Sequence, residues 1–167
     1  IGRAPYGPRL AGEVRAFTLE AARWLLAQDI KVLVLACNTA TARALPDVRR
    51  AANVPVVGVV RPGAVAAAAA TRRRRVGVIA TAGTVESDAY PRAILEADSA
   101  IKVTQLACPE LVPMVEAGML DGRRAESVIR AYLEPLLAAE PAMDTLLLGC
   151  THYPLLAPML QRILGRD

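Results

Sequence analysis

The sequence predicts an α/β fold in which short parallel strands alternate with helices. Short continuous apolar runs recur along the chain, as in strands covered on both faces, and the segments between them carry apolar residues at helical spacing. This alternation predicts parallel sheets with right-handed crossovers, whose active sites gather at the carboxyl ends of the strands. No glycine-rich nucleotide-binding motif follows any of the predicted strands.

The order of the elements follows from these patterns and from the residues that interrupt them. Pro8 suits the first turn of the opening helix, Pro46 marks a kink or a second start, and residues 61–63 (Arg-Pro-Gly) separate a strand from the next helix. The opening helix is expected to bury one face made of Val14, Phe17, Ala21, Trp24 and Leu25. The predicted elements are helix 8–28, strand 32–35, helix 39–52, strand 56–60, helix 64–71, strand 76–80, helix 85–97, strand 101–106, helices 109–117 and 123–138, strand 145–148 and helix 154–164.

The composition is that of a globular protein. A chain of 167 residues, 54% hydrophobic and 22% charged, can bury the core of one large or two small domains. No apolar run approaches the ~20 residues of a membrane helix. The first residues form no signal-peptide core and include no initiator Met, so the chain is expected to be a fragment.

Charge gives little indication of a macromolecular partner. The formal net charge is +4, and four consecutive arginines at residues 72–75 lie between an Ala-rich helical segment and a strand. A solvated connection is the favoured interpretation of this run, because aromatic residues for base stacking are scarce. Nucleic acid and membranes are therefore not expected partners.

The three cysteines are expected to be reduced thiols. Cys37, Cys108 and Cys150 are widely spaced and include no C-x-x-C pair, which argues against a disulfide framework and for the cytoplasm. Because His152 is the single histidine, no zinc site is expected. Cys108 is interpreted as a core residue, since a proline and no polar cluster follows it.

A local pattern around the other two cysteines occurs twice. Residues 32–39 (Val-Leu-Val-Leu-Ala-Cys-Asn-Thr) and 145–152 (Thr-Leu-Leu-Leu-Gly-Cys-Thr-His) both run from an apolar strand through a small residue to a cysteine and two hydrogen-bonding side chains. A thiol between strand and helix meets the positive end of the helix dipole and free backbone N–H groups, which lower the thiol pKa. The same N–H groups can hold a carboxylate. The pattern predicts two half-sites, each with a base and an anion cradle.

Two such thiols suit the racemisation of an amino acid. This reaction removes a weakly acidic α-proton and returns one to the opposite face, which calls for two opposed groups, one deprotonated and one protonated. A pyridoxal-phosphate route needs a Schiff-base lysine, but Lys31 precedes a strand and Lys102 lies within one, so no cofactor is expected. The alternative for each cysteine is a small buried hydrophobe, with its Asn and Thr neighbours acting as helix caps.

The same segments resemble the cysteine signatures of bacterial glutamate racemase, in the aspartate/glutamate racemase superfamily. The resemblance rests on residues 36–40 (Ala-Cys-Asn-Thr-Ala) and 148–156 (Leu-Gly-Cys-Thr-His-Tyr-Pro-Leu-Leu), in that order. Residues 5–7 (Pro-Tyr-Gly) resemble the family's substrate loop, and residues 108–116 resemble its middle segment. The likeness covers essentially the whole chain.

The resemblance implies a role for each matching residue. Cys37 and Cys150 would be the catalytic acid/bases of a cofactor-independent interconversion of L- and D-glutamate, which provides D-glutamate for peptidoglycan. His152 and Glu116 would assist the second thiol, with an exposed helical carboxylate as the alternative for Glu116. The residues implied to bind substrate are Tyr6, Gly7, Asn38, Thr39, Thr151 and His152, with Thr81 and Thr84 as additions.

The resemblance also implies an architecture of two similar parallel-sheet α/β domains that face each other across a cleft, in a homodimer. The first, residues 1–61, is expected to be incomplete, because the family's opening strand with its Asp-Ser pair and its C-terminal return have no match; the second is 62–167. Two other functions stay open. One is an aspartate- or hydantoin-type racemase that uses the same thiols, and the other is a catalytically inactive binding relative.

Overall fold

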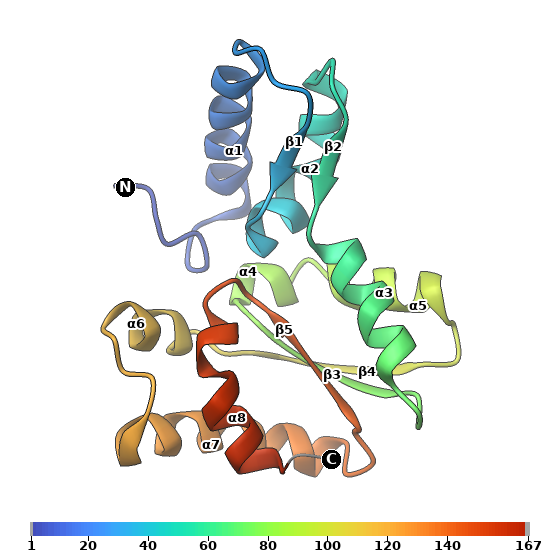
Figure 1. The fold of residues 1–167 in the computed structure, drawn as a ribbon, viewed down its shortest axis with the longest axis vertical. Coiled ribbons are helices and arrows are strands. Elements are labelled where there is room, and N and C mark those ends of the chain that lie inside the picture. Colours follow the sequence, from blue (N-terminus) through green and yellow to red (C-terminus); the bar gives the residue numbers. More distant parts are fainter. Residues whose placement is uncertain (1, 166–167) are drawn as a thin grey trace.

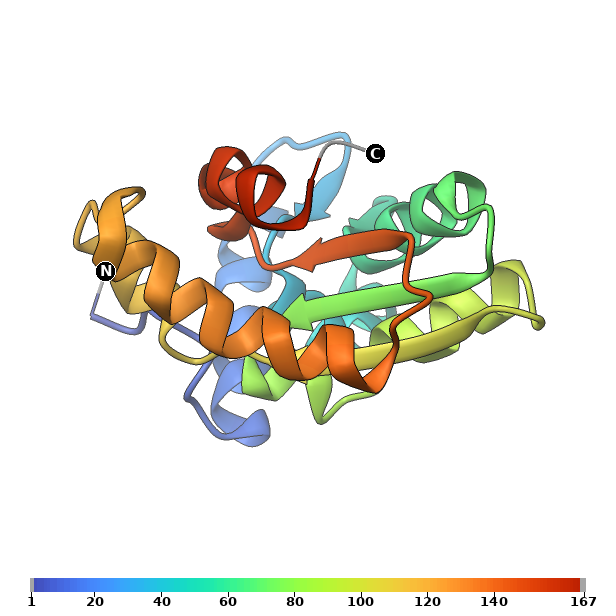
Figure 2. The same ribbon diagram turned by 90° about the horizontal axis from the view of Figure 1, so that it is seen from below.

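The computed structural model describes residues 2–165 and contains two parallel sheets, each with its own helices (Figure 1, Figure 2). The first sheet pairs β1 (Leu33–Leu35) with β2 (Val56–Gly58). In the second, β3 (Arg75–Ala80) lies between β4 (Lys102–Ala107) and β5 (Thr145–Gly149), and both pairings are parallel. The predicted class, α/β with two parallel-sheet domains, is confirmed.

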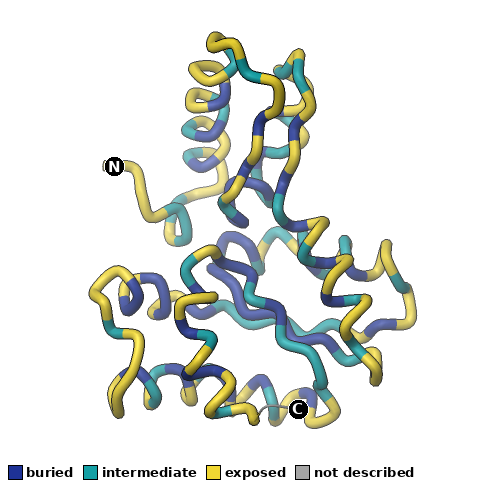
Figure 3. Tube along the Cα trace, in the orientation of Figure 1, coloured by how far each residue is buried: buried dark blue, intermediate teal, exposed yellow. Residues whose placement is uncertain are grey.

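The first sheet carries its helices on one face. α1 (Ala11–Leu26) and α2 (Asn38–Ala51) bury a small core that includes Leu33 and Leu35 of β1. Side chains alternate between the faces of a strand, so Val34, between these two, points away from the helices and is 53% exposed. The expectation that this strand is covered on both faces is therefore wrong, and Figure 3 shows the alternation of buried and exposed positions.

The buried stripe of α1 also differs from the prediction. The helix starts at Ala11, after a Leu10 N–H that donates to the Glu13 carboxylate at 3.1 Å, and its buried residues are Val14, Thr18 and Ala22. The predicted face shares only Val14 with this stripe. Apolar residues occupy more than one side of α1, so their spacing alone did not distinguish the side that packs on the sheet.

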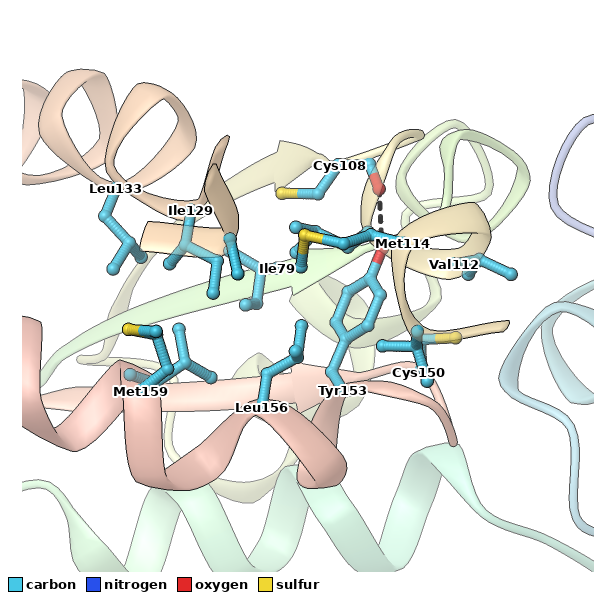
Figure 4. Close-up of a cluster of buried hydrophobic side chains, with 14 of the residues drawn as sticks. Ile79, Cys108, Val112, Met114, Ile129, Leu133, Cys150, Tyr153, Leu156 and Met159 are labelled. Atoms are coloured by element: carbon cyan, nitrogen blue, oxygen red, sulfur yellow. Dashed lines mark hydrogen bonds between the residues drawn. The ribbon is translucent and has the colours of Figure 1, made fainter. Parts of the chain in front are cut away.

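The second sheet is the middle layer of three. α3 and α5 cover one face, where Val76, Val78 and Ile94 are buried. α6, α7, α8 and the 3₁₀ helix η1 cover the other, around Ile79 and Leu156 (Figure 4). These helices are α3 (Val60–Ala70), α5 (Ala89–Ala97), α6 (Leu111–Glu116), α7 (Gly122–Ala139), η1 (Tyr153–Leu156) and α8 (Ala157–Leu164).

Some predicted boundaries are corrected by local backbone chemistry. α3 begins at Val60, so Pro62 lies in its first turn, where a missing N–H costs nothing. The helix predicted over 85–97 begins later, as α5 at Ala89, and a separate short helix, α4 (Ala82–Val85), ends where the predicted helix was to begin. Asp88, whose φ is 51°, breaks the helical path between them. Within residues 2–165, no helix is long and apolar enough to cross a bilayer.

Candidate active site

The carboxyl ends of β1 and β5 open into one cavity between the two sheets, with a volume of about 890 Å³. Cys37 and Cys150, which follow these strands, both line it. Thr84 and Glu116 are not lining residues, but each contacts one, Thr39 and His152 respectively. Among residues 2–165, no three His, Cys, Asp or Glu side chains are placed to hold a metal ion. The other predicted site residues that line the cavity are Tyr6, Gly7, Asn38, Thr39, Thr81, Thr151 and His152.

Cys37 has the predicted strand–thiol–helix geometry. It is the N-cap residue of α2, with an extended backbone, and its carbonyl accepts the Thr41 N–H at 2.9 Å. The free N–H groups of the first helical turn and the positive end of the helix dipole therefore lie beside this partly exposed thiol. This half-site offers electrostatic stabilisation to a thiolate or to a bound carboxylate.

Cys150 is in a different environment. A turn and the four-residue η1 follow it in place of a regular α-helix, and the residue is 7% exposed, beside Val112 at the margin of the core (Figure 4). Burial raises the pKa of the Cys150 thiol, as does a negative charge on Cys37, while the backbone N–H groups of His152 and Thr151 act in the opposite direction. The expected lowering of the thiol pKa is therefore wrong for Cys150.

His152 links the Cys150 thiol to a carboxylate. Its Nδ1 lies 3.7 Å from the Cys150 Sγ, and its Nε2 lies 2.5 Å from Oε1 of Glu116, at the end of α6. A carboxylate only accepts, so Nε2–H is the donor in that bond, which leaves Nδ1 of a neutral imidazole free to accept the thiol proton. The arrangement can therefore take a proton from Cys150 and stabilise the imidazolium that forms.

Three threonine hydroxyls join the two halves of the cavity. Thr39, at the start of α2, has its Oγ1 2.9 Å from that of Thr81 and 3.3 Å from that of Thr84, and the latter two are 3.0 Å apart. All three side chains are buried. Each hydroxyl can donate to the next and accept from the previous one, so the cluster is satisfied without water.

Sequence reasoning missed the apolar wall of the cavity. Phe17 and Trp24 of α1, which were assigned to a buried helix face, line the cavity instead, and Trp24 is 67% exposed. Arg3 lies over the Phe17 ring, 4.8 Å from its centroid, and pairs with Glu20 at 2.8 Å. The excess of apolar residues around α1 was the signal that one side of the helix faces something other than the sheet.

Comparison with known proteins identifies the family. The family described as Asp/Glu/Hydantoin racemase matches residues 4–166. The chain belongs to this racemase family. Two curated relatives are glutamate racemases: that of Oceanobacillus iheyensis is 50% identical over 99% of this chain, and that of Lactiplantibacillus plantarum is 49% identical over 98%. The chain spans about 60% of the length of these two racemases.

Solved structures of glutamate racemases have the same fold. An isoform from Bacillus anthracis superposes with a TM-score of 0.93 at 42% identity, covering 99% of this chain and 62% of its own. The enzyme from Francisella tularensis, solved with D-glutamate, gives 0.90 at 32% identity with the same coverage. The resemblance drawn from the cysteine segments is confirmed.

Proposed function

We propose that this racemase-family protein interconverts L- and D-glutamate through two thiols and no cofactor, supplying D-glutamate for peptidoglycan. The observation that carries the proposal is that Cys37 and Cys150, from different sheets, line one cavity. The glutamate racemases at about 50% identity support glutamate as the substrate, in preference to aspartate or a hydantoin.

In the proposed mechanism the thiols exchange protonation states. A thiolate on one side takes the α-proton, its S–H bond forms as the Cα–H bond breaks, and the thiol on the other side then donates its proton to the planar carbanion. For Cys150 the raised pKa keeps the resting group a thiol, the form that donates. When Cys150 must act as the base, His152 Nδ1 accepts its proton and Glu116 stabilises the imidazolium.

The remaining site residues hold the substrate in this proposal. Asn38, Thr39 and Thr151, with the N–H groups beside Cys37, bind carboxylate oxygens, and Tyr6 and Gly7 close the cavity from the N-terminal loop. Gly7 is suited to this place, because an added Cβ would lie 3.1 Å from the Thr81 methyl group. Thr81 and Thr84 fix the Thr39 hydroxyl.

The proposal includes the domain division, the location and the assembly. The chain passes from the first sheet to the helices of the second just after β2, in support of domains 1–61 and 62–167. The three cysteines are unpaired, as in a reducing cytoplasm. The homodimer rests on the resemblance and is tested by light scattering, where a monomer mass contradicts it.

The test is racemisation of L-glutamate by the full chain in D₂O. We expect D-glutamate on chiral chromatography and deuterium at the α-carbon, with Cys37→Ala and Cys150→Ala each losing about a thousandfold or more. Cys108→Ala is the matched control, because that thiol is buried in the core and is expected to leave turnover unchanged. Activity surviving in either single variant contradicts the two-thiol mechanism.

The same assay separates the alternatives. Preferred turnover of aspartate or a hydantoin contradicts glutamate as the substrate but keeps the thiols. Binding of glutamate without any deuterium incorporation indicates a binding relative, because a pure binder does not open the Cα–H bond.

A further inference from the structure

Tyr90, which the sequence did not single out, connects the two halves of the candidate site. It lies on α5, over the second sheet, and its hydroxyl donates a 2.5 Å hydrogen bond to Oδ1 of Asn38 on α2, beside the first sheet. Both residues are buried, with 3% of Tyr90 and 7% of Asn38 exposed. The bond therefore lies in an interior where an unpaired partner is costly.

This bond determines which way the Asn38 amide points. An amide carries an acceptor oxygen on one side and two N–H donors on the other, so an oxygen that accepts from Tyr90 leaves the NH₂ group for a different neighbour. Asn38 also lines the cavity. Burial raises the pKa of the Tyr90 phenol, so it remains protonated and continues to donate.

The ring of Tyr90 contacts the other half-site. A Cβ added at Gly149, the residue before Cys150, would lie 2.9 Å from Cε2 of Tyr90, so the ring packs directly on this stretch of backbone. One side chain thus contacts the residue after Cys37 and the residue before Cys150.

We infer that Tyr90 is a positioning residue for the racemisation: its hydroxyl holds the Asn38 amide with both N–H donors toward the cavity, for a carboxylate of the substrate, and its ring supports the backbone that carries Cys150. The inference rests on the proposed function. Tyr90 acts through Asn38 and Gly149 and is not itself one of the reacting groups.

Tyr90→Phe tests the inference, because it keeps the ring and removes only the hydroxyl. Without that donor the Asn38 amide is free to turn, so we expect KM for glutamate to rise about tenfold and kcat to change less than about threefold. Tyr132→Phe is the matched control, since the Tyr132 hydroxyl donates to Glu110 at 3.0 Å and neither residue lines the cavity. An unchanged KM in a folded Tyr90→Phe protein overturns the inference.

Two Asn38 variants separate positioning from general packing. In an Asn38→Ala background, Tyr90→Phe should raise KM no further, whereas a merely structural role gives the same added loss in both backgrounds. Asn38→Asp keeps an acceptor for Tyr90 but has no N–H donors and adds a negative charge that repels the substrate carboxylate, so its KM should rise at least as much as in Asn38→Ala. This variant tests the inference even if Tyr90→Phe folds poorly. A wild-type KM in Asn38→Asp overturns the inference.

The outcomes also distinguish this inference from the function on which it rests. A wild-type chain that racemises nothing overturns the proposed function and this inference with it. A wild-type chain that racemises glutamate, with a Tyr90→Phe variant that matches it in KM, overturns the inference alone.

Discussion

The two cysteine half-sites have matching sequences and different surroundings. Cys37 caps the 14-residue α2, so a helix N-terminus lies next to its sulfur. Cys150 is followed by a turn and a four-residue 3₁₀ helix, is more deeply buried, and has His152 and Glu116 as neighbours. The comparison shows that an apolar strand followed by a small residue and a cysteine fixes where a thiol lies, but not what stabilises its charge.

The largest effect expected from this difference is at His152. His152→Ala removes the acceptor of the Cys150 proton, so kcat should fall about hundredfold, more in the direction in which Cys150 is the base. Glu116→Gln keeps an acceptor for Nε2–H but loses the charge, and because Glu116 is 66% exposed we expect only about a threefold loss. Steady-state kinetics in both directions of the reaction measures kcat for each variant. A wild-type kcat in His152→Ala would mean that Cys150 can lose its proton without His152.

An intermediate effect is expected at Gly149, whose counterpart in the first half-site is Ala36. A Cβ there would lie 2.9 Å from both the Ala80 Cβ and the Tyr90 ring, so Gly149→Ala should lower the free energy of unfolding by about 1–3 kcal/mol. Gly12→Ala, in an open position on α1, should instead raise it by up to about 1 kcal/mol. Urea unfolding compares them, and equal stability of the two variants contradicts the close packing at Gly149.

The smallest effect concerns the electrostatic coupling of the thiols. Burial raises the pKa of Cys150, so the pH at which iodoacetamide modifies it half-maximally should lie above that of an unperturbed thiol, about 8.5. A thiolate at Cys37 disfavours a second negative charge nearby, so Cys37→Ser should lower the pKa of Cys150. Peptide mass spectrometry over a pH series follows the modification of Cys150 alone. A higher pKa of Cys150 in Cys37→Ser than in the wild type would contradict the direction that we assign to the coupling.

Local patterns in the sequence were sufficient for the sheets and the position of the thiols. Apolar runs located all five strands of residues 2–165, and the rule that sites gather at carboxyl strand ends brought Cys37 and Cys150 to one cavity. The extent of burial was less predictable. Trp24 has helical spacing like a core residue, but whether it meets a sheet or a cavity depends on segments far away in the chain.

The long-range hydrogen bond between Tyr90 and Asn38 was not predictable. Tyr90 and Asn38 are separated by 52 positions, and nothing near Tyr90 distinguishes it from a tyrosine that only packs. The break at Asp88 was also missed, because an Asp inside an amphipathic pattern gives no warning of a left-handed backbone. Both features depend on tertiary structure.

The closed ring of threonine hydroxyls has a consequence for anion binding. Three hydroxyls carry three protons, and while Thr39, Thr81 and Thr84 donate only to one another, none is directed at the cavity. A carboxylate that accepts the Thr39 proton opens the circle into a line, in which Thr84 donates to Thr81 and Thr81 to Thr39. Successive donors polarise one another, so the last bond in such a line is the strongest. Thr84 thereby strengthens the hydrogen bond from Thr39 to a bound anion, although Thr84 does not contact that anion itself.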